Sequence, residues 1–228
     1  MNWVVNNTDA IVANLLAHLA LSVPPILLSF LVSLPFGWFA NRYRWSRGTL
    51  LTGLGVLYAI PSLAMFILLP VLLGIPLRST ANVITGLTLY GVALMVRTTS
   101  DALGAVSDDV RQSATAMGYS GWARFWRVEF PLAGPVLLSG LRVVTVSTVS
   151  LVTVGAVLGI QSLGLLFTDG FQRGITGEIV TGIVLTIVLA LVLDGLLVLI
   201  GRLLMPWTAL DRTRRSRRPV AVERAVTS

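Results

Sequence analysis

Long, continuous runs of apolar residues dominate the chain. A helix needs roughly 18 or more such residues to cross ~30 Å of hydrocarbon, and most of the runs reach that length. They predict an all-α membrane protein with about five transmembrane helices. The predicted spans cover residues 19–40, 50–73, 81–96, 136–158 and 179–204.

The composition excludes an ordinary soluble domain. Apolar residues make up 55% of the chain and charged residues 12%. The runs also contain prolines, among them Pro24, Pro35 and Pro61. Membrane helices tolerate proline because neighbouring helices and hydroxyl side chains satisfy the freed backbone groups. The continuous runs are also unlike the alternating pattern of a membrane β-barrel.

The arginines predict the orientation. All 17 basic residues are arginine, and the net charge is +7. Arg78 and Arg173 fall in loops on one side of the predicted spans, and Arg142 falls inside the fourth span. By the positive-inside rule the N-terminus is outside and the C-terminus is cytoplasmic. This orientation places the other fourteen arginines on the cytoplasmic side: Arg42, Arg44, Arg47, Arg97, Arg111, Arg124, Arg127, Arg202, Arg212, Arg214, Arg215, Arg217, Arg218 and Arg224.

The two ends are predicted to lie outside the transmembrane domain, which we place at residues 19–205. Residues 1–18 form an extracytoplasmic segment without the basic start of a cleavable signal. Residues 9–20 are predicted to form a short helix outside, with His18 at the membrane interface. Residues 206–228 form a basic cytoplasmic tail, expected to contact anionic headgroups rather than nucleic acid.

Few residues are available for chemistry. There is no cysteine, one histidine and no lysine. These counts argue against a disulfide framework, a multi-histidine metal centre and a nucleophile–base pair. Without lysine there is no phosphate-binding loop of the Gly-x-x-x-x-Gly-Lys type. We therefore expect no catalysis, cofactor or metal on this chain.

Residues 107–135 carry the most informative pattern. Ser107 and two aspartates predict a helix start, and Gly118 predicts its end. A second short helix is predicted from Ser120, and Phe130–Pro131 is expected to end it because the residue before proline avoids the helical region. On the second helix Trp122, Phe125 and Trp126 share a face, away from Arg124 and Arg127.

Two interpretations of this aromatic ridge remain open from physics alone. An exposed ridge on a cytoplasmic helix suits docking into a groove of a soluble partner. The same residues also suit an amphipathic loop lying on the membrane surface.

The spacing in this segment resembles the EAA loop of permease subunits of ATP-binding-cassette importers. That signature reads Glu-Ala-Ala, three residues, Gly, nine residues, an aliphatic residue, one residue, Leu-Pro. Here Gln112-Ser113-Ala114, Gly118, Val128 and Phe130-Pro131 stand at the required positions. Two residues depart from the signature. Gln112 replaces the usual glutamate and so lacks a charge that could contact the partner, and Phe130 replaces the usual leucine.

A second resemblance narrows the family. Residues 58–66, Tyr-Ala-Ile-Pro-Ser-Leu-Ala-Met-Phe, resemble a second-span signature of permeases for glycine betaine, carnitine, choline and related osmoprotectants. Residues 118–129 are similar to the same group. The alternative interpretation of residues 58–66 is a proline-bent span that packs against its neighbours, so this motif is weaker evidence than the spacing of the EAA loop.

The resemblance implies a type I importer permease fold in a bacterial cytoplasmic membrane. It implies an identical or paralogous permease, two ATPase subunits that bind ATP and Mg, and an extracytoplasmic substrate-binding protein. Tyr58, Phe66 and Tyr90 are candidate pathway aromatics, although aromatics in spans more often pack or anchor. Coupling to the ATPase is assigned to residues 107–131, with these candidates: Gln112, Ser113, Ala114, Gly118, Trp122, Arg124, Phe125, Trp126 and Pro131.

Other functions remain as alternatives: a secondary transporter, an importer permease for an amino acid or other amine, and a membrane scaffold. A gradient-driven transporter needs charged residues inside the bundle, where only Arg142 and Asp194 qualify. Arg142 lies ~16 Å past Pro131 and Asp194 ~15 Å before Leu204, at 1.5 Å per helical residue. At this similar depth they are predicted to pair, within one chain or across a permease dimer. Otherwise each faces the pathway separately, or Arg142 extends toward the cytoplasm.

Overall fold

The computed structural model describes residues 2–207, and within that range helices are the only regular secondary structure. The predicted basic tail therefore lies, except for its first two residues, outside the part described. The main helices are α1 (Asn2–Asn6), α2 (Thr8–Arg42), α3 (Arg44–Ala59), α4 (Ser62–Leu73), α5 (Thr80–Gly104), α6 (Asp108–Ala116), α7 (Gly121–Arg124), α8 (Phe130–Val152), α9 (Gly164–Arg173) and α10 (Thr176–Leu204). A π-helical turn, Phe125–Glu129, joins α7 to α8, and a 3-10 helix, Thr153–Leu158, follows α8.

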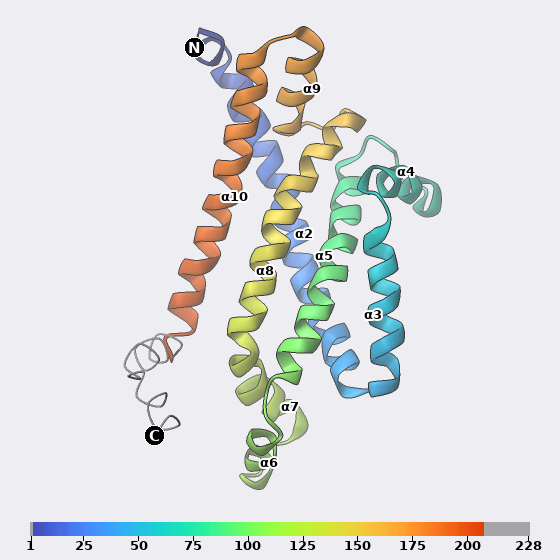
Figure 1. Ribbon diagram of the computed structural model, residues 1–228, viewed down its shortest axis with the longest axis vertical. Coiled ribbons are helices and arrows are strands. Elements are labelled where there is room, and N and C mark those ends of the chain that lie inside the picture. The colour runs from blue at the N-terminus through green and yellow to red at the C-terminus, as the bar shows by residue number, and fades with distance from the viewer. Residues whose placement is uncertain (1, 208–228) are drawn as a thin grey trace, which may run out of the picture.

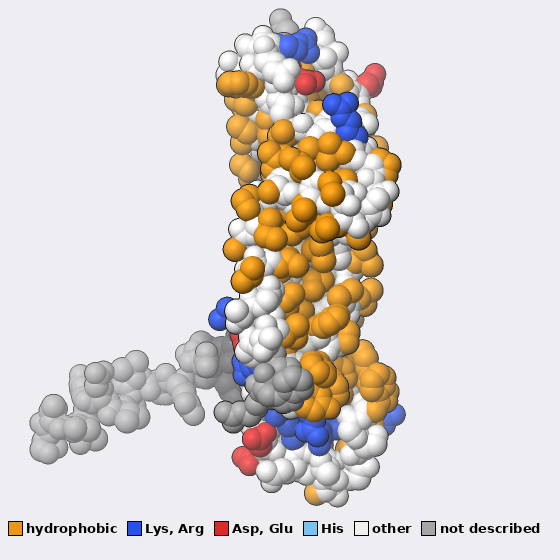
Figure 2. Space-filling model, turned by 90° about the vertical axis from the view of Figure 1, so that its right-hand side faces the viewer, with side chains coloured by type: hydrophobic (Ala, Val, Ile, Leu, Met, Phe, Trp, Pro, Cys, Tyr) orange, Lys and Arg blue, Asp and Glu red, His pale blue; other side chains and the backbone are white. Residues whose placement is uncertain are grey.

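The bundle is built around α5. This helix packs against α2, α8, α3 and α4, whereas α10 packs on α8 and α9 at the opposite side (Figure 1). Apolar side chains cover the middle of the molecule, and charged ones gather toward its two ends (Figure 2). A band of this kind is the surface that a lipid bilayer requires.

The predicted five spans agree with the structure when one bent pair is counted as a single span. Within residues 2–207, four helical segments are long and apolar enough to cross a membrane: α2, α5, α10 and the continuous stretch over residues 121–158. The fifth is made by α3 and α4, which meet at an angle of 105°. Pro61 lies at the break, and the Tyr90 hydroxyl donates to the freed Ile60 carbonyl.

The third span is longer than the predicted residues 81–96. Its helix, α5, continues to Gly104, because small polar residues in its second half pack inside the bundle instead of ending the helix. Thr99 occupies the space that a Cβ on Gly37 of α2 would need, and Thr98 does the same against Gly140 of α8. Such contacts let membrane helices approach closely.

The prediction of a separate outer helix over residues 9–20 was wrong. These residues are the first turns of α2, which runs without a break through the predicted domain boundary at residues 18 and 19. Pro24, Pro25 and Pro35 all lie inside the same helix.

His18 is a buried residue, not the predicted interfacial one. Its side chain has no exposed surface, and it joins three parts of the bundle. Nε2 lies 3.0 Å from the Val149 carbonyl of α8, and Nδ1 lies 3.3 Å from the Leu163 amide before α9. A carbonyl can only accept and an amide N–H can only donate, so the ring is neutral with its proton on Nε2.

His18→Leu tests this buried junction. The substitution leaves one carbonyl and one N–H without partners, so we expect it to lower the free energy of unfolding by about 1–3 kcal/mol. Titration of the purified protein with SDS in mixed micelles measures the change. Leu16→Ala on the same helix is the control: its side chain is 60% exposed, and a loss of no more than about 0.5 kcal/mol is expected. Equal midpoints for His18→Leu and the wild type would contradict a role in stability.

Candidate functional site

The segment between α5 and α8 projects from one end of the bundle (Figure 1). Its first helix, α6, begins after Ser107 with Asp108 and Asp109 in its first turn. It ends in a Schellman motif, where the Tyr119 amide donates to the Ala114 carbonyl and the Gly118 amide to Thr115. Gly118 has φ +87°, a left-handed conformation that strains other residues. The predicted helix stop at Gly118 is confirmed.

The second helix continues into α8 rather than ending at Phe130–Pro131 as predicted. Ser120 caps α7, its hydroxyl accepting from the Ala123 amide at 3.3 Å. The π-helical turn follows, and in it the Phe130 amide donates to the Phe125 carbonyl five residues back. This wider turn, together with the place of Pro131 in the first turn of α8, lets the chain pass proline without a break.

The predicted exposed ridge contains two aromatic residues, not three. Trp122 is 74% exposed and Trp126 42%, whereas Phe125 is only 8% exposed. Phe125 packs into a core cluster that includes Leu103 of α5 and Leu137 of α8. Phe125 therefore holds the segment to the bundle, and Trp122 is the most exposed of the three aromatic residues.

Glu129 fastens the two short helices together. Its buried carboxylate lies 2.8 Å from Nε of Arg124 and 3.6 Å from Nε of Arg111. Arg124 also donates to the Thr115 hydroxyl at 2.9 Å, and Arg111 donates to the Leu103 carbonyl at 2.6 Å. The sequence reasoning missed Glu129, because its partners are brought to it only by the fold.

The other predicted coupling residues lie on both faces of the segment. Ala114 is buried and Pro131 half-buried, so both face the protein interior at least in part. Gln112, Ser113 and Gly118 are exposed, and Gln112 borders a shallow hollow with Asp108 and Thr115. The surface available to a partner therefore combines the outer side of α6 with Trp122.

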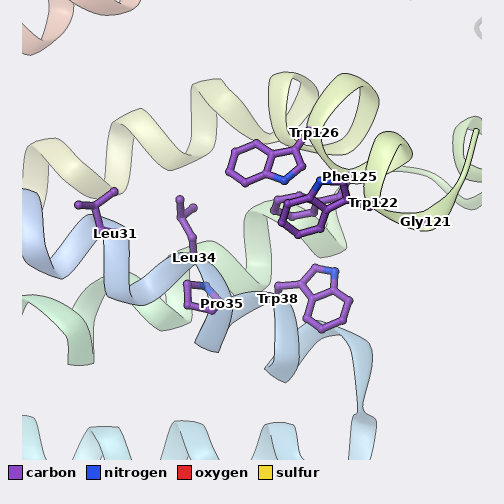
Figure 3. A pocket seen from close by; sticks show the side chains of 8 residues that line it. All are labelled: Leu31, Leu34, Pro35, Trp38, Gly121, Trp122, Phe125 and Trp126. Atoms are coloured by element: carbon purple, nitrogen blue, oxygen red, sulfur yellow. The ribbon is translucent and has the colours of Figure 1, made fainter.

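An apolar groove separates this segment from α2. Figure 3 shows side chains from α2 facing the aromatic residues of α7 and the π-helical turn. The groove has a volume of about 540 Å³. Its lining consists of Leu31, Leu34, Pro35, Trp38, Gly121, Trp122, Phe125 and Trp126.

Arg142 and Asp194 pair within one chain. Nε and Nη2 of Arg142 lie 2.6 and 2.7 Å from the two carboxylate oxygens of Asp194, a bidentate arrangement. The pair connects α8 with α10, and its side chains are 43% and 21% exposed.

The three candidate pathway aromatics are not gathered on one open surface. Phe66 is fully buried against Gly86 in the core. Tyr90 is also buried, with its hydroxyl on the Ile60 carbonyl. Tyr58 is 42% exposed and meets Tyr90 edge-on at 5.7 Å between ring centroids. Within residues 2–207 no cluster of three or more His, Asp or Glu side chains is placed to hold a metal ion.

The chain is similar to known transport proteins in sequence and in fold. Residues 33–208 match the family described as binding-protein-dependent transport system inner membrane component. The osmoprotectant import permease protein OsmW of Salmonella typhimurium is 28% identical, over 86% of this chain and 93% of its own length. The glycine betaine/carnitine/choline transport system permease protein OpuCB of Bacillus subtilis is 26% identical, over 83% and 86%.

Solved structures support the same fold. A structure of the MetNI methionine ABC transporter in an inward-facing conformation matches with a TM-score of 0.76 at 19% identity, over 87% of this chain and 98% of the matched one. An amino acid ABC transporter crystallised with histidines matches with a TM-score of 0.67 at 14% identity, over 89% and 95%. The chain therefore belongs to the family of binding-protein-dependent transport system inner membrane components, as a multi-pass membrane permease rather than a catalytic protein.

Proposed function

We propose that this chain lines the translocation pathway of an ATP-driven importer for a small osmoprotectant such as glycine betaine, choline or carnitine. The names of the relatives support this solute class, because OsmW, OpuCB and a choline permease protein of Bacillus subtilis each align with at least 83% of the chain. The family description supports dependence on a binding protein.

The proposed assembly contains three further kinds of protein subunit and lies in a lipid bilayer. An identical or paralogous permease completes the pathway, and two ATPase subunits bind ATP and Mg on the cytoplasmic side. An extracytoplasmic substrate-binding protein delivers the solute, and the bilayer surrounds the apolar band. The fold matches those of chains from two ABC transporters, which supports this arrangement.

The observation that carries the proposal is the construction of the segment over residues 107–131. The spacing of the importer signature falls on two short helices that project from the bundle and present Gln112 and Trp122. The parts of this segment are also joined to one another, because Glu129 pairs with arginines of both α6 and α7 and the π-helical turn continues into α8. A movement that a bound partner imposes on the outer face of the segment is therefore transmitted directly to the membrane helix α8.

The orientation that we propose has this segment in the cytoplasm. The N-terminus of α2 and the α9–α10 hairpin lie at the other end of the bundle (Figure 1). The excess of arginine at the end that carries α6 and α7 supports a cytoplasmic position.

Uptake into proteoliposomes tests the function. The permease is reconstituted with its cognate ATPase, and the binding protein and labelled glycine betaine are added outside the vesicles. The label is expected to accumulate inside only when the vesicles contain ATP. Ionophores that collapse ion gradients distinguish the gradient-driven alternative. Uptake that persists without ATP and disappears with the ionophores would contradict the proposal.

Trp122→Ala and Phe125→Ala are expected to fail in different ways. Truncating a central interface aromatic often costs about 2 kcal/mol or more, so Trp122→Ala should weaken ATPase binding roughly 30-fold while the permease remains stable. Phe125→Ala creates a cavity inside the bundle and should cost about 3–5 kcal/mol of permease stability instead. Pull-down of the ATPase, normalised to folded permease, separates the two effects. Wild-type ATPase binding by Trp122→Ala would count against docking through this residue.

Labelling of single introduced cysteines tests the orientation. The chain contains no native cysteine, so none has to be removed first. Phe171 at the α9 end and Met117 at the α6 end are 80% and 70% exposed, which makes them a matched pair. In intact cells a membrane-impermeant maleimide should label Phe171→Cys, and Met117→Cys only after permeabilisation. The reverse pattern would overturn the orientation.

A further inference from the structure

The Arg142–Asp194 pair interrupts an apolar surface. Around it α8 and α10 present large exposed apolar side chains, among them Val143, Val146 and Leu191. Arg142 nevertheless keeps 43% and Asp194 21% of its side-chain surface exposed, and both lie well inside their helices.

This exposure is unfavourable toward hydrocarbon. Charged side chains at membrane depth are stable when they face a protein interior or a water-filled cavity. The groove beside the pair combines polar and apolar groups, as a site for a small organic ion does. The two charges and the hydroxyls of Ser139 and Ser147 provide the polar part, and the apolar part consists of Val143, Val146, Ile187, Ala190 and Leu191. The volume of the groove is about 600 Å³, within the usual range for small-molecule sites.

From this geometry we propose that the α8–α10 groove is a transient site for a zwitterionic solute in the pathway. The solute carboxylate takes the bidentate position on Arg142, and its cationic group takes the place of the guanidinium beside Asp194. The proposal rests on the proposed transport function and deepens it by naming the residues that receive the solute.

The exchange is balanced in charge. Breaking a membrane ion pair from one side leaves an uncompensated charge, which is strongly unfavourable. A zwitterion supplies both replacements at once, so neither Arg142 nor Asp194 is left unpaired. An ion that carries one charge can satisfy only one of them. The closed pair therefore favours solutes with both charges, so that within the proposed solute class glycine betaine and carnitine bind here in preference to choline, which carries one charge.

Accessibility of the groove provides the first test. Ser147→Cys lies in the groove, whereas Leu196→Cys is a matched control on α10 that is 48% exposed and outside it. In the purified ATPase complex, sulfonatoethyl methanethiosulfonate should modify Ser147→Cys at least tenfold faster than Leu196→Cys. Glycine betaine should slow that modification at least fivefold, and tetramethylammonium or acetate at equal ionic strength should not. Equal labelling of the two cysteines, or equal protection by the singly charged ions, would overturn the proposal.

Transport by a doubly neutral variant provides the second test. The double variant Arg142→Gln with Asp194→Asn removes both charges and leaves no unpaired charge in the membrane. The amount of assembled complex should therefore remain at the wild-type level. Glycine betaine uptake should fall at least tenfold. A charge swap, Arg142→Asp with Asp194→Arg, keeps the link between α8 and α10 and serves as the structural control. Undiminished uptake by the doubly neutral variant would count against this site alone, whereas a wild-type complex without ATP-dependent uptake would count against the proposed function.

Discussion

The close approach of α2, α5 and α8 is the constraint on which the rest of the structure depends. Glycines on α2 and α8 leave room for the threonines of α5, and Gly91 of α5 leaves room for Ser29 of α2 in the same way. Lipid provides no hydrophobic drive for helix association, so tight packing of small residues must supply it. The projecting segment is attached at both ends to these closely packed helices, because α5 precedes the segment and α8 follows it.

Much of the fold follows from the apolar runs, because membrane helices must satisfy their backbone internally. The incorrect predictions arose where polar residues were interpreted as lying outside the membrane, in contact with water. His18 was placed at the interface and residues 97–104 outside the third span, but the fold gives them partners: Val149 and Leu163 for His18, and the glycines of α2 and α8 for Thr98 and Thr99. These partners are distant along the chain, so local pattern did not indicate them.

The candidate site was predicted in outline and corrected in detail. The turn at Gly118 follows from glycine's freedom at positive φ, and the ion pair from the similar depth of Arg142 and Asp194. Helical periodicity placed Phe125 on the same face as Trp122, but only the packing against α5 and α8 shows which aromatic is buried. Phe130–Pro131 was taken as a helix end because the rule for a residue before proline ignores the π-helical turn.

The unbroken path from α7 into α8 makes the helix a lever. Arg142 lies ~16 Å beyond Pro131 along its axis, at 1.5 Å per residue. A tilt of roughly 10° about Pro131 displaces a point at that distance by about 3 Å, which is as long as a hydrogen bond. If α10 stays in place, this small rotation is enough to separate Arg142 from Asp194. The ion pair is thus positioned to convert an angle at the membrane surface into an open or closed state in its interior.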